Sequence, residues 1–243
     1  MVQGVTEFLP VSSSGHLILA RDVFRFTTEY GLAIDAVLQL ATALAVIVYF
    51  FKDLVAIVTE RKVALALALV VGTIPAVIAG IYLETSMETL FRSSELVAYA
   101  LIVGSLIMLG AEYFAHERAT QLSWREGLVV GLFQCLALVP GMSRSGMTIA
   151  GGMFLGLTRT EAARFGFLLA VPILLGSGLK KLVELGSAGI LSEFGPALLT
   201  GFVASFISGL IAIYLLLAIV RRTPLTVFVV YRVALALLIL ALL

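Results

Sequence analysis

Long apolar stretches alternate along the chain with short runs of polar and charged residues. A helix that crosses a bilayer needs about 20 mostly apolar residues. The stretches that reach or approach this length are residues 31–51, 63–83, 96–115, 165–179, 195–220 and 223–243. The pattern predicts an all-α, polytopic integral membrane bundle, in which residues 1–243 form a single membrane domain.

Three further apolar segments are too short or too polar to span a bilayer alone. They cover residues 1–20, 127–143 and 145–158, each beside a cluster of Pro, Gly and Ser. Irregular backbone at membrane depth is tolerated only where protein buries it or a cavity hydrates it. We therefore predict two re-entrant hairpins, at residues 1–27 and about 127–157, whose tips meet near the bilayer middle. We also expect the first membrane helix to begin upstream of Met1.

Two pairs of segments indicate an internal repeat. Residues 8–15 (FLPVSSSG) are similar to residues 138–146 (LVPGMSRSG), and residues 72–80 (GTIPAVIAG) are similar to residues 169–176 (LAVPILLG). Interrupted helices in two related halves are typical of membrane proteins whose sites lie at the interface of inverted-topology repeats. The sequence predicts one repeat at about residues 1–115 and the other at about residues 120–243.

Composition agrees with a membrane protein and limits its partners. Hydrophobic residues make up 61% of the chain and charged residues 13%, against roughly 45–50% and about 25% in soluble domains. A net charge of +1 gives no strong attraction for nucleic acid, so we expect none as a partner. The oligomeric state stays open, a homodimer included.

The distribution of Lys and Arg predicts the orientation in the membrane. Residues 52–62 hold Lys52, Arg61 and Lys62, whereas residues 84–95 hold three glutamates and one arginine. Cytoplasmic loops carry the excess of basic residues. The first loop is therefore predicted to be cytoplasmic and the second external. This places residues 14–30 on the external side.

Gln3 and Glu7 form the first candidate group. Residues four apart share one face of a helix, about 5–6 Å apart at Cβ, so the amide and the carboxylate point to one place. Carboxylate and amide oxygens suit a hard cation such as Mg²⁺ or Ca²⁺. The alternative is a polar pair whose members satisfy each other between helices, although carboxylates inside a membrane are functional by default.

The second candidate group follows Pro10 and consists of Ser12, Ser13, Ser14 and His16. Proline ends one helix and a serine caps the next, and the N–H groups at a helix N-terminus form an anion site. A histidine beside hydroxyls is typical of general base catalysis. The alternative for the serines is a plain capped turn.

The third candidate group follows Pro140 and consists of Ser143, Arg144, Ser145 and Thr148. Arg144 lies between two charge-free runs, so a buried guanidinium here needs an anion, and its fork suits phosphate oxygens. The alternative is a structural ion pair with Glu7 or with Glu126.

Arg232 lies in the middle of the last apolar stretch, beside Tyr231. A charge at that depth is costly unless a partner compensates it. We interpret Arg232 as a structural ion partner.

The three candidate groups together hold the parts that phosphoryl transfer needs. Such catalysis is mainly positioning and charge neutralisation. An arginine and helix N-termini would hold a multiply charged anion, a carboxylate would hold a divalent cation, and a serine or a histidine-activated water would attack. Because the site is predicted at membrane depth, the substrate must be amphiphilic.

The same residues resemble the undecaprenyl-diphosphate phosphatase family, also known as bacitracin-resistance proteins. The family pairs a Glu/Gln-x-x-x-Glu motif, running into a Pro-Val-Ser-Ser-x-Gly-His motif, with a Pro-Gly-x-Ser-Arg-Ser-Gly motif. Here these read QGVTEFLPVSSSGH at residues 3–16 and PGMSRSG at residues 140–146. The likeness continues through residues 159–172 and covers almost the whole chain.

The resemblance implies hydrolysis of undecaprenyl diphosphate to the monophosphate and phosphate, which recycles the lipid carrier of cell-wall synthesis. It implies a bacterial cell membrane location, an outward-facing site and a divalent metal. By motif position, the metal and diphosphate group is Gln3 and Glu7. The catalytic group is Glu7, Ser13 as candidate nucleophile, His16 as base or alternative nucleophile, and Arg144. The substrate-binding group is Ser12, Ser14, Ser143, Ser145 and Thr148.

Two other readings compete with this one. A different class of lipid phosphatase uses a Ser-Arg-x₅-His motif, which Ser143 and Arg144 echo, but Ala150 stands where its histidine belongs. We reject that class. A polyprenyl-phosphate transporter or flippase remains an alternative, because repeats with broken helices are transporter architecture.

Overall fold

The computed structural model describes residues 1–24, 31–89, 93–117 and 122–242, and every regular element in them is a helix. The helices are α1 (Val2–Phe8), α2 (Ser13–Phe24), α3 (Gly31–Tyr49), α4 (Phe51–Thr59), α5 (Val63–Thr89), α6 (Ser94–Phe114), α7 (Trp124–Leu136), α8 (Arg144–Phe154), α9 (Arg159–Ser187), α10 (Ile190–Val220) and α11 (Thr226–Leu242).

Four of these helices are long and apolar enough to cross a membrane. They lie at Val63–Leu83, Ser94–Phe114, Arg159–Ser187 and Gly195–Val220. The pair α3 and α4, bent by 64°, counts as a fifth span if it is taken as one. The prediction of an all-α, polytopic membrane protein is confirmed. One difference is that α9 extends well beyond the predicted residues 165–179 at both ends.

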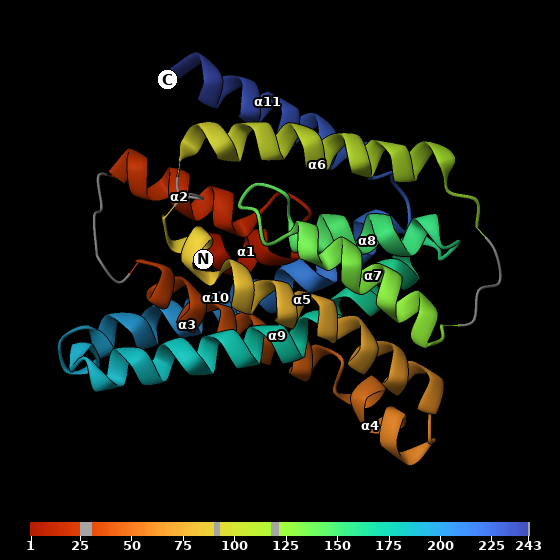
Figure 1. Cartoon of the computed structure of the whole chain (residues 1–243), viewed down its shortest axis with the longest axis horizontal. Coiled ribbons are helices and arrows are strands. Elements are labelled where there is room, and N and C mark those ends of the chain that lie inside the picture. The colour runs from red at the N-terminus through yellow and green to blue at the C-terminus, as the bar shows by residue number, and fades with distance from the viewer. Residues whose placement is uncertain (25–30, 90–92, 118–121, 243) are drawn as a thin grey trace.

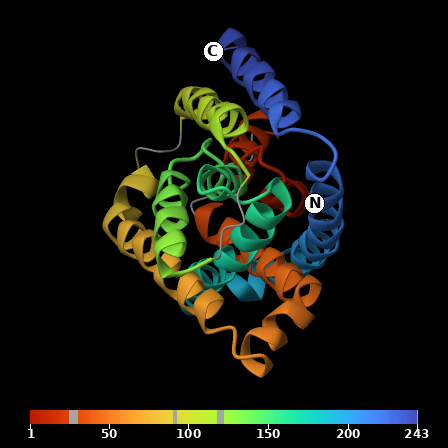
Figure 2. The ribbon, with the colours of Figure 1, turned by 90° about the vertical axis from the view of Figure 1, so that its right-hand side faces the viewer.

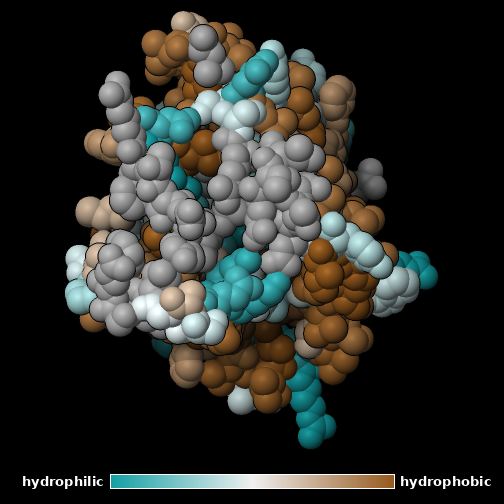
Figure 3. All heavy atoms as spheres, turned by 60° about the vertical axis from the view of Figure 1, so that its left-hand side comes forward, coloured by the Kyte–Doolittle hydropathy of each residue, from teal (hydrophilic) through white to brown (hydrophobic). Residues whose placement is uncertain are grey.

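Large apolar side chains cover much of the outside of the bundle. On α10, Val203, Ile207, Ile211 and Leu215 are each about half exposed and follow one another one helical turn apart. Figure 3 shows brown, hydrophobic surface along the upper, right and lower parts of the face that it displays. Contiguous apolar surface of this extent marks an interaction surface, and lipid is its solvent in a polytopic protein.

The short helices lie between two layers of longer ones. Helices α6 and α11 pack together along one side of the molecule, while α3, α9 and α10 form the opposite side (Figures 1 and 2). Helices α1, α2, α7 and α8 occupy the middle (Figure 1). The breaks of the two predicted hairpins, at Ser12 and Ser143, are buried in the protein, where irregular backbone is shielded from lipid.

Glycines let α1 and α7 approach their neighbours very closely. A Cβ on Gly131 of α7 would lie 2.2 Å from the Gly72 carbonyl oxygen of α5, and a Cβ on Gly4 of α1 would lie 2.1 Å from Ser208 Oγ of α10. Small residues at helix contacts are typical of membrane interiors. This contact fixes the first helix of each hairpin against a long helix.

Each hairpin breaks where its proline and serines predict. Helix α2 follows Ser12 and α8 follows Ser143, and both serines have a left-handed backbone, with φ of 73° and 75°. The Oγ of each accepts a hydrogen bond from the glycine N–H three residues later, Gly15 or Gly146. The two breaks share this geometry, and the repeat, its inverted topology and the depth of the hairpins stay predictions.

Candidate active site

The Glu7 carboxylate is the centre of the candidate site. Its Oε2 accepts hydrogen bonds from Gln3 Nε2 at 2.9 Å and from Ser13 Oγ at 2.5 Å. Its Oε1 lies 3.2 Å from Arg144 Nη1. The side chain of Glu7 is only 4% exposed. The structure thus gathers one residue from α1, one from the start of α2 and one from the start of α8 around a buried carboxylate.

Two hydrogen bonds join the turn that precedes α2 directly to the turn that precedes α8. The Gly141 N–H donates to Ser12 Oγ at 3.0 Å, and Ser145 Oγ donates to the Leu9 carbonyl oxygen at 3.1 Å. In Figure 1 the loop before α8 reaches the middle of the molecule, beside α1 and the start of α2. The two serines therefore hold the turns together, and this contact sets the separation of Glu7 and Arg144.

The other predicted binding residues lie around the start of α8 and the start of α2. Ser143 Oγ is 3.2 Å from Ser145 Oγ, and Ser14 Oγ is 3.4 Å from Ser12 Oγ. Thr148 lies one turn into α8, where its hydroxyl donates to the Arg144 carbonyl oxygen at 3.0 Å. The Thr148 hydroxyl thus stabilises the first turn of α8.

His16 faces away from this cluster. Its Nδ1 lies 2.7 Å from the Ser12 carbonyl oxygen, and its Nε2 lies 2.7 Å from the hydroxyl of Tyr231 on α11. Among the described contacts, the Ser13 hydroxyl is hydrogen-bonded to Glu7 and not to His16. Among the predicted catalytic residues, the structure brings Glu7, Ser13 and Arg144 together and places His16 in a neighbouring pair with Tyr231.

Arg232 is fully buried and has no carboxylate partner among its described contacts. The prediction of an ion partner is wrong. Its guanidinium donates to Ser105 Oγ and to four backbone carbonyl oxygens, those of Pro10, Leu101, Gly141 and Met142. A guanidinium carries five N–H donors in a fixed fork, so one side chain can satisfy carbonyls of both turns at once.

Tyr231 and Arg232 are the site residues that sequence reasoning missed. Arg232 gave a signal, because a charge inside an apolar stretch needs an explanation. That signal led us to predict the wrong class of partner, because the free backbone carbonyls at a helix break cannot be recognised in a sequence. Tyr231 gave none, because an aromatic residue in a membrane helix is ordinary.

Some buried polar atoms at the site have no hydrogen-bond partner in the described part of the chain. They include Gln3 Oε1 and Arg144 Nη1; the latter is within ion-pair distance of Glu7 but lacks hydrogen-bond geometry. Buried polar groups are normally satisfied. One free acceptor and one free donor on either side of Glu7 match a ligand that brings both a cation and an anion.

No open cavity separates Glu7 from Arg144, since the two side chains touch. The larger of two described surface hollows, about 610 Å³, is lined by Met1 and α10. The described residues also contain no group of three or more His, Cys, Asp and Glu side chains close enough to hold a metal by themselves.

Comparison with known families identifies the chain. The family model described as bacitracin resistance protein BacA matches residues 1–238. The chain belongs to this family. The match covers both turns and the residues that surround Glu7, so the resemblance read from the two motifs is confirmed.

Several curated relatives of this BacA-family chain bear the name undecaprenyl-diphosphatase. Those from Mycobacterium sp. strain KMS and from Mycolicibacterium smegmatis are each 43% identical over 261 aligned positions, which cover 100% of this chain and 94% of the relative. The relative from Myxococcus xanthus is 42% identical and covers 100% of this chain, which spans 86% of that protein.

Proposed function

We propose that this chain is a membrane phosphatase that hydrolyses undecaprenyl diphosphate to undecaprenyl phosphate and inorganic phosphate. The observation that carries the proposal is the contact of one buried carboxylate, Glu7, with both the Ser13 hydroxyl and the Arg144 guanidinium. The name of the relatives supports the same substrate. The reaction recycles the lipid carrier for peptidoglycan synthesis and confers bacitracin resistance.

Ser13 is the nucleophile in this proposal and Glu7 is its base. The Ser13 oxygen bonds to the terminal phosphorus while its proton passes to Glu7 Oε2, the acceptor it already contacts at 2.5 Å. The bond between that phosphorus and the bridging oxygen breaks, and the lipid monophosphate leaves with the electron pair. A hydroxyl beside a general base is the usual arrangement for an activated serine.

Water completes the reaction. The water oxygen bonds to the phosphorus of phosphoserine while the bond between that phosphorus and the Ser13 oxygen breaks. The Ser13 oxygen then takes back the proton held by Glu7. The proton lost by the water passes to Glu7 and then to solvent. Glu7 is the base nearest Ser13 in this arrangement, because the two ring nitrogens of His16 contact Ser12 and Tyr231.

Arg144 holds the diphosphate. Its Nη1 lacks a hydrogen-bond partner, and charge-assisted bonds to phosphate oxygens satisfy such a donor. The N–H groups at the starts of α2 and α8 add anion-binding capacity, with Ser14, Ser143 and Ser145 beside them. When the headgroup enters, it takes the place of Glu7 as the anion that neutralises Arg144.

Gln3 and Glu7 would hold a divalent cation, Mg²⁺ or Ca²⁺. Gln3 Oε1 is a buried oxygen without a partner, next to a carboxylate. Mg²⁺ is usually bound through one or two carboxylates together with phosphates of the substrate, so two protein oxygens suffice if the diphosphate supplies the rest. A bound cation would neutralise charge on the phosphate oxygens.

We place the site on the external side of the bacterial cell membrane. Lys52, Arg61 and Lys62 support a cytoplasmic position for residues 52–62, and the alternation of sides along the chain then puts residues 14–30 outside. The apolar surface of α10 faces lipid, so the polyprenyl chain of the substrate stays in the bilayer while its headgroup reaches Glu7.

Phosphate release tests the proposed function. The purified chain in detergent should release inorganic phosphate from a C55 or a shorter polyprenyl diphosphate. Acid quenching during turnover should trap phosphate on Ser13, and the Ser13→Ala variant should carry none. Absence of phosphate release would contradict the phosphatase. Release of inorganic phosphate without any phosphate trapped on Ser13 would contradict Ser13 as the nucleophile and leave direct attack by water as the mechanism.

Removal of divalent cations tests the metal. A chelator should lower phosphate release by about tenfold or more, because neutralisation of the diphosphate is lost, and added Mg²⁺ should restore it. The Gln3→Ala variant should need about ten times more Mg²⁺ for half-maximal rate, since it removes one oxygen ligand. Full activity of the wild type in the chelator would rule out a metal requirement.

A further inference from the structure

The His16 side chain bridges α2 and α11 rather than reaching the reacting hydroxyl. A carbonyl oxygen only accepts hydrogen bonds, so the contact of Nδ1 with the Ser12 carbonyl at 2.7 Å requires the proton on Nδ1. In the neutral imidazole the lone pair is then on Nε2. That lone pair faces the Tyr231 hydroxyl at 2.7 Å, which donates to it.

The rings of His16 and Tyr231 lie with their planes nearly parallel. The ring planes of His16 and Tyr231 differ by only 7°, with centroids 5.8 Å apart. The Ser12 carbonyl oxygen therefore fixes the tautomer, because the hydrogen bond made by one ring nitrogen decides which nitrogen carries the proton, and Tyr231 holds the ring by donating to the other nitrogen.

The pair continues into the contact between the turns. The carbonyl oxygen of Ser12 accepts a hydrogen bond from His16 Nδ1. The backbone of Ser12 is left-handed, with φ of 73°. In this conformation its Oγ accepts from the N–H of Gly141 in the other turn. A left-handed conformation is strained for a residue with a side chain, so surrounding contacts must hold it.

We propose that Tyr231 is a positioning residue, which through His16 holds Ser12 in the conformation that joins the two turns and so places Ser13 against Glu7. Ser13 follows Ser12 directly in the chain. The backbone conformation of Ser12 therefore decides whether the Ser13 hydroxyl points toward Glu7, to which it now donates a hydrogen bond. This inference rests on the proposed function for its rate effect. It assigns His16 a positioning role, in place of the base or nucleophile that the family resemblance implies.

The Tyr231→Phe variant tests the inference, because it keeps the ring and removes only the hydroxyl. We expect kcat to fall about tenfold, the effect of one lost hydrogen bond, with KM within about twofold of the wild type, since Arg144 still binds the substrate. The matched control is Tyr214→Phe on α10, an exposed tyrosine, which should leave both constants unchanged.

A double variant separates an effect through His16 from a general structural effect. If Tyr231 acts only through His16, then His16→Ala and the combination His16→Ala with Tyr231→Phe should have the same kcat, because coupled residues are not additive. An additive loss would contradict the inference. So would a wild-type kcat in Tyr231→Phe.

Histidine ¹⁵N spectra give a readout that does not need activity. The chain has two histidines, and His16→Ala assigns the signals. The wild type should show His16 with its proton on Nδ1, and Tyr231→Phe should shift the Nε2 signal of His16 while leaving His116 unchanged. A proton on Nε2 in the neutral wild type would overturn the inference, even where phosphate release confirms the function. A wild type that releases no phosphate but shows this shift would refute only the function.

Discussion

Replacement of Glu7 by Gln should lower phosphate release by about a thousandfold, within the range of 10²–10⁴ that a positioned general base contributes. The amide is the same size as the carboxylate and can still accept from Ser13. It cannot take the proton of Ser13, and it leaves Arg144 without its ion-pair partner. The rate measured with saturating polyprenyl diphosphate checks the expectation.

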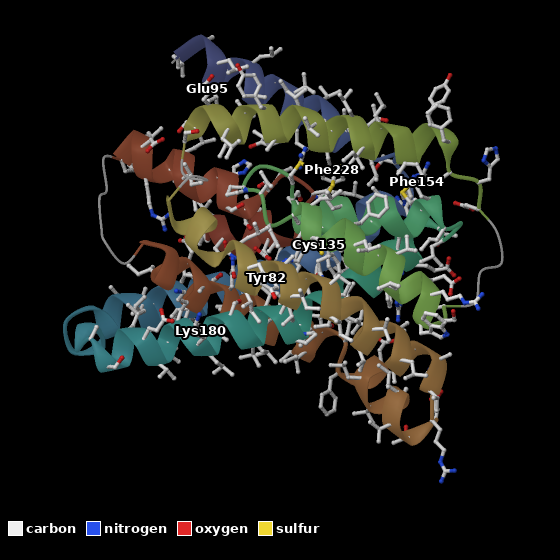
Figure 4. All side chains as sticks on the ribbon, in the orientation of Figure 1. Tyr82, Glu95, Cys135, Phe154, Lys180 and Phe228 are labelled. Atoms are coloured by element: carbon white, nitrogen blue, oxygen red, sulfur yellow. The ribbon has the colours of Figure 1, made fainter. Side chains whose placement is uncertain are left out.

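Two further variants make the Glu7 result specific. Glu95→Gln is the matched control, because Glu95 is exposed and lies at the outer end of α6, away from the centre of the bundle (Figure 4); it should keep the wild-type rate. Glu7→Asp keeps the charge and withdraws it by one methylene, so an intermediate rate is expected. A Glu7→Gln variant that works as well as Glu95→Gln would remove Glu7 from the chemistry.

Replacement of Arg232 by Met should lower both stability and activity. Met fills similar space but leaves the turn carbonyls of Pro10, Gly141 and Met142 without the donor they now have. Each buried acceptor left unsatisfied costs about 1–3 kcal/mol, and relief of the buried charge offsets part of this. We expect a net loss of about 3 kcal/mol in stability and at least a hundredfold in rate.

Thermal unfolding in detergent and phosphate release measure the two effects of Arg232. Arg222→Met is the control, because Arg222 is exposed after the end of α10. Arg232→Lys keeps the charge but has one ammonium in place of the guanidinium fork, so it should be nearly as inactive as the methionine variant. Unfolding and rate at wild-type values in Arg232→Met would show that the turns are held by other contacts.

The fold was predictable from the sequence to the extent that single residues dictate it. Proline disfavours the continuation of a helix, although α5, α9 and α10 each contain one. Pro10 and Pro140 differ in the serines that follow them and cap the next helix, so both breaks follow from local chemistry. The meeting of Glu7 with Arg144 followed from the cost of charge in a membrane. Because an unpaired charge is costly there, opposite charges are expected to pair even when they are far apart in the sequence.

Other features depend on contacts that local sequence does not encode. His16 and Tyr231 are 215 residues apart, and nothing in either neighbourhood indicates the other. The acceptors of Arg232 are backbone atoms, which every residue has. The pairing of Ser13 with Glu7 instead of His16 depends on the left-handed backbone at Ser12, and serine does not prefer that conformation.

The closed contact between Glu7 and Arg144 has a consequence for the design of inhibitors. A compound that competes for this site has to displace an internal carboxylate from the guanidinium, so it needs an anionic group of its own. A neutral polyprenyl analogue would occupy lipid beside the bundle and leave the pair intact. Potency should therefore follow the charge of the head more than the length of the tail.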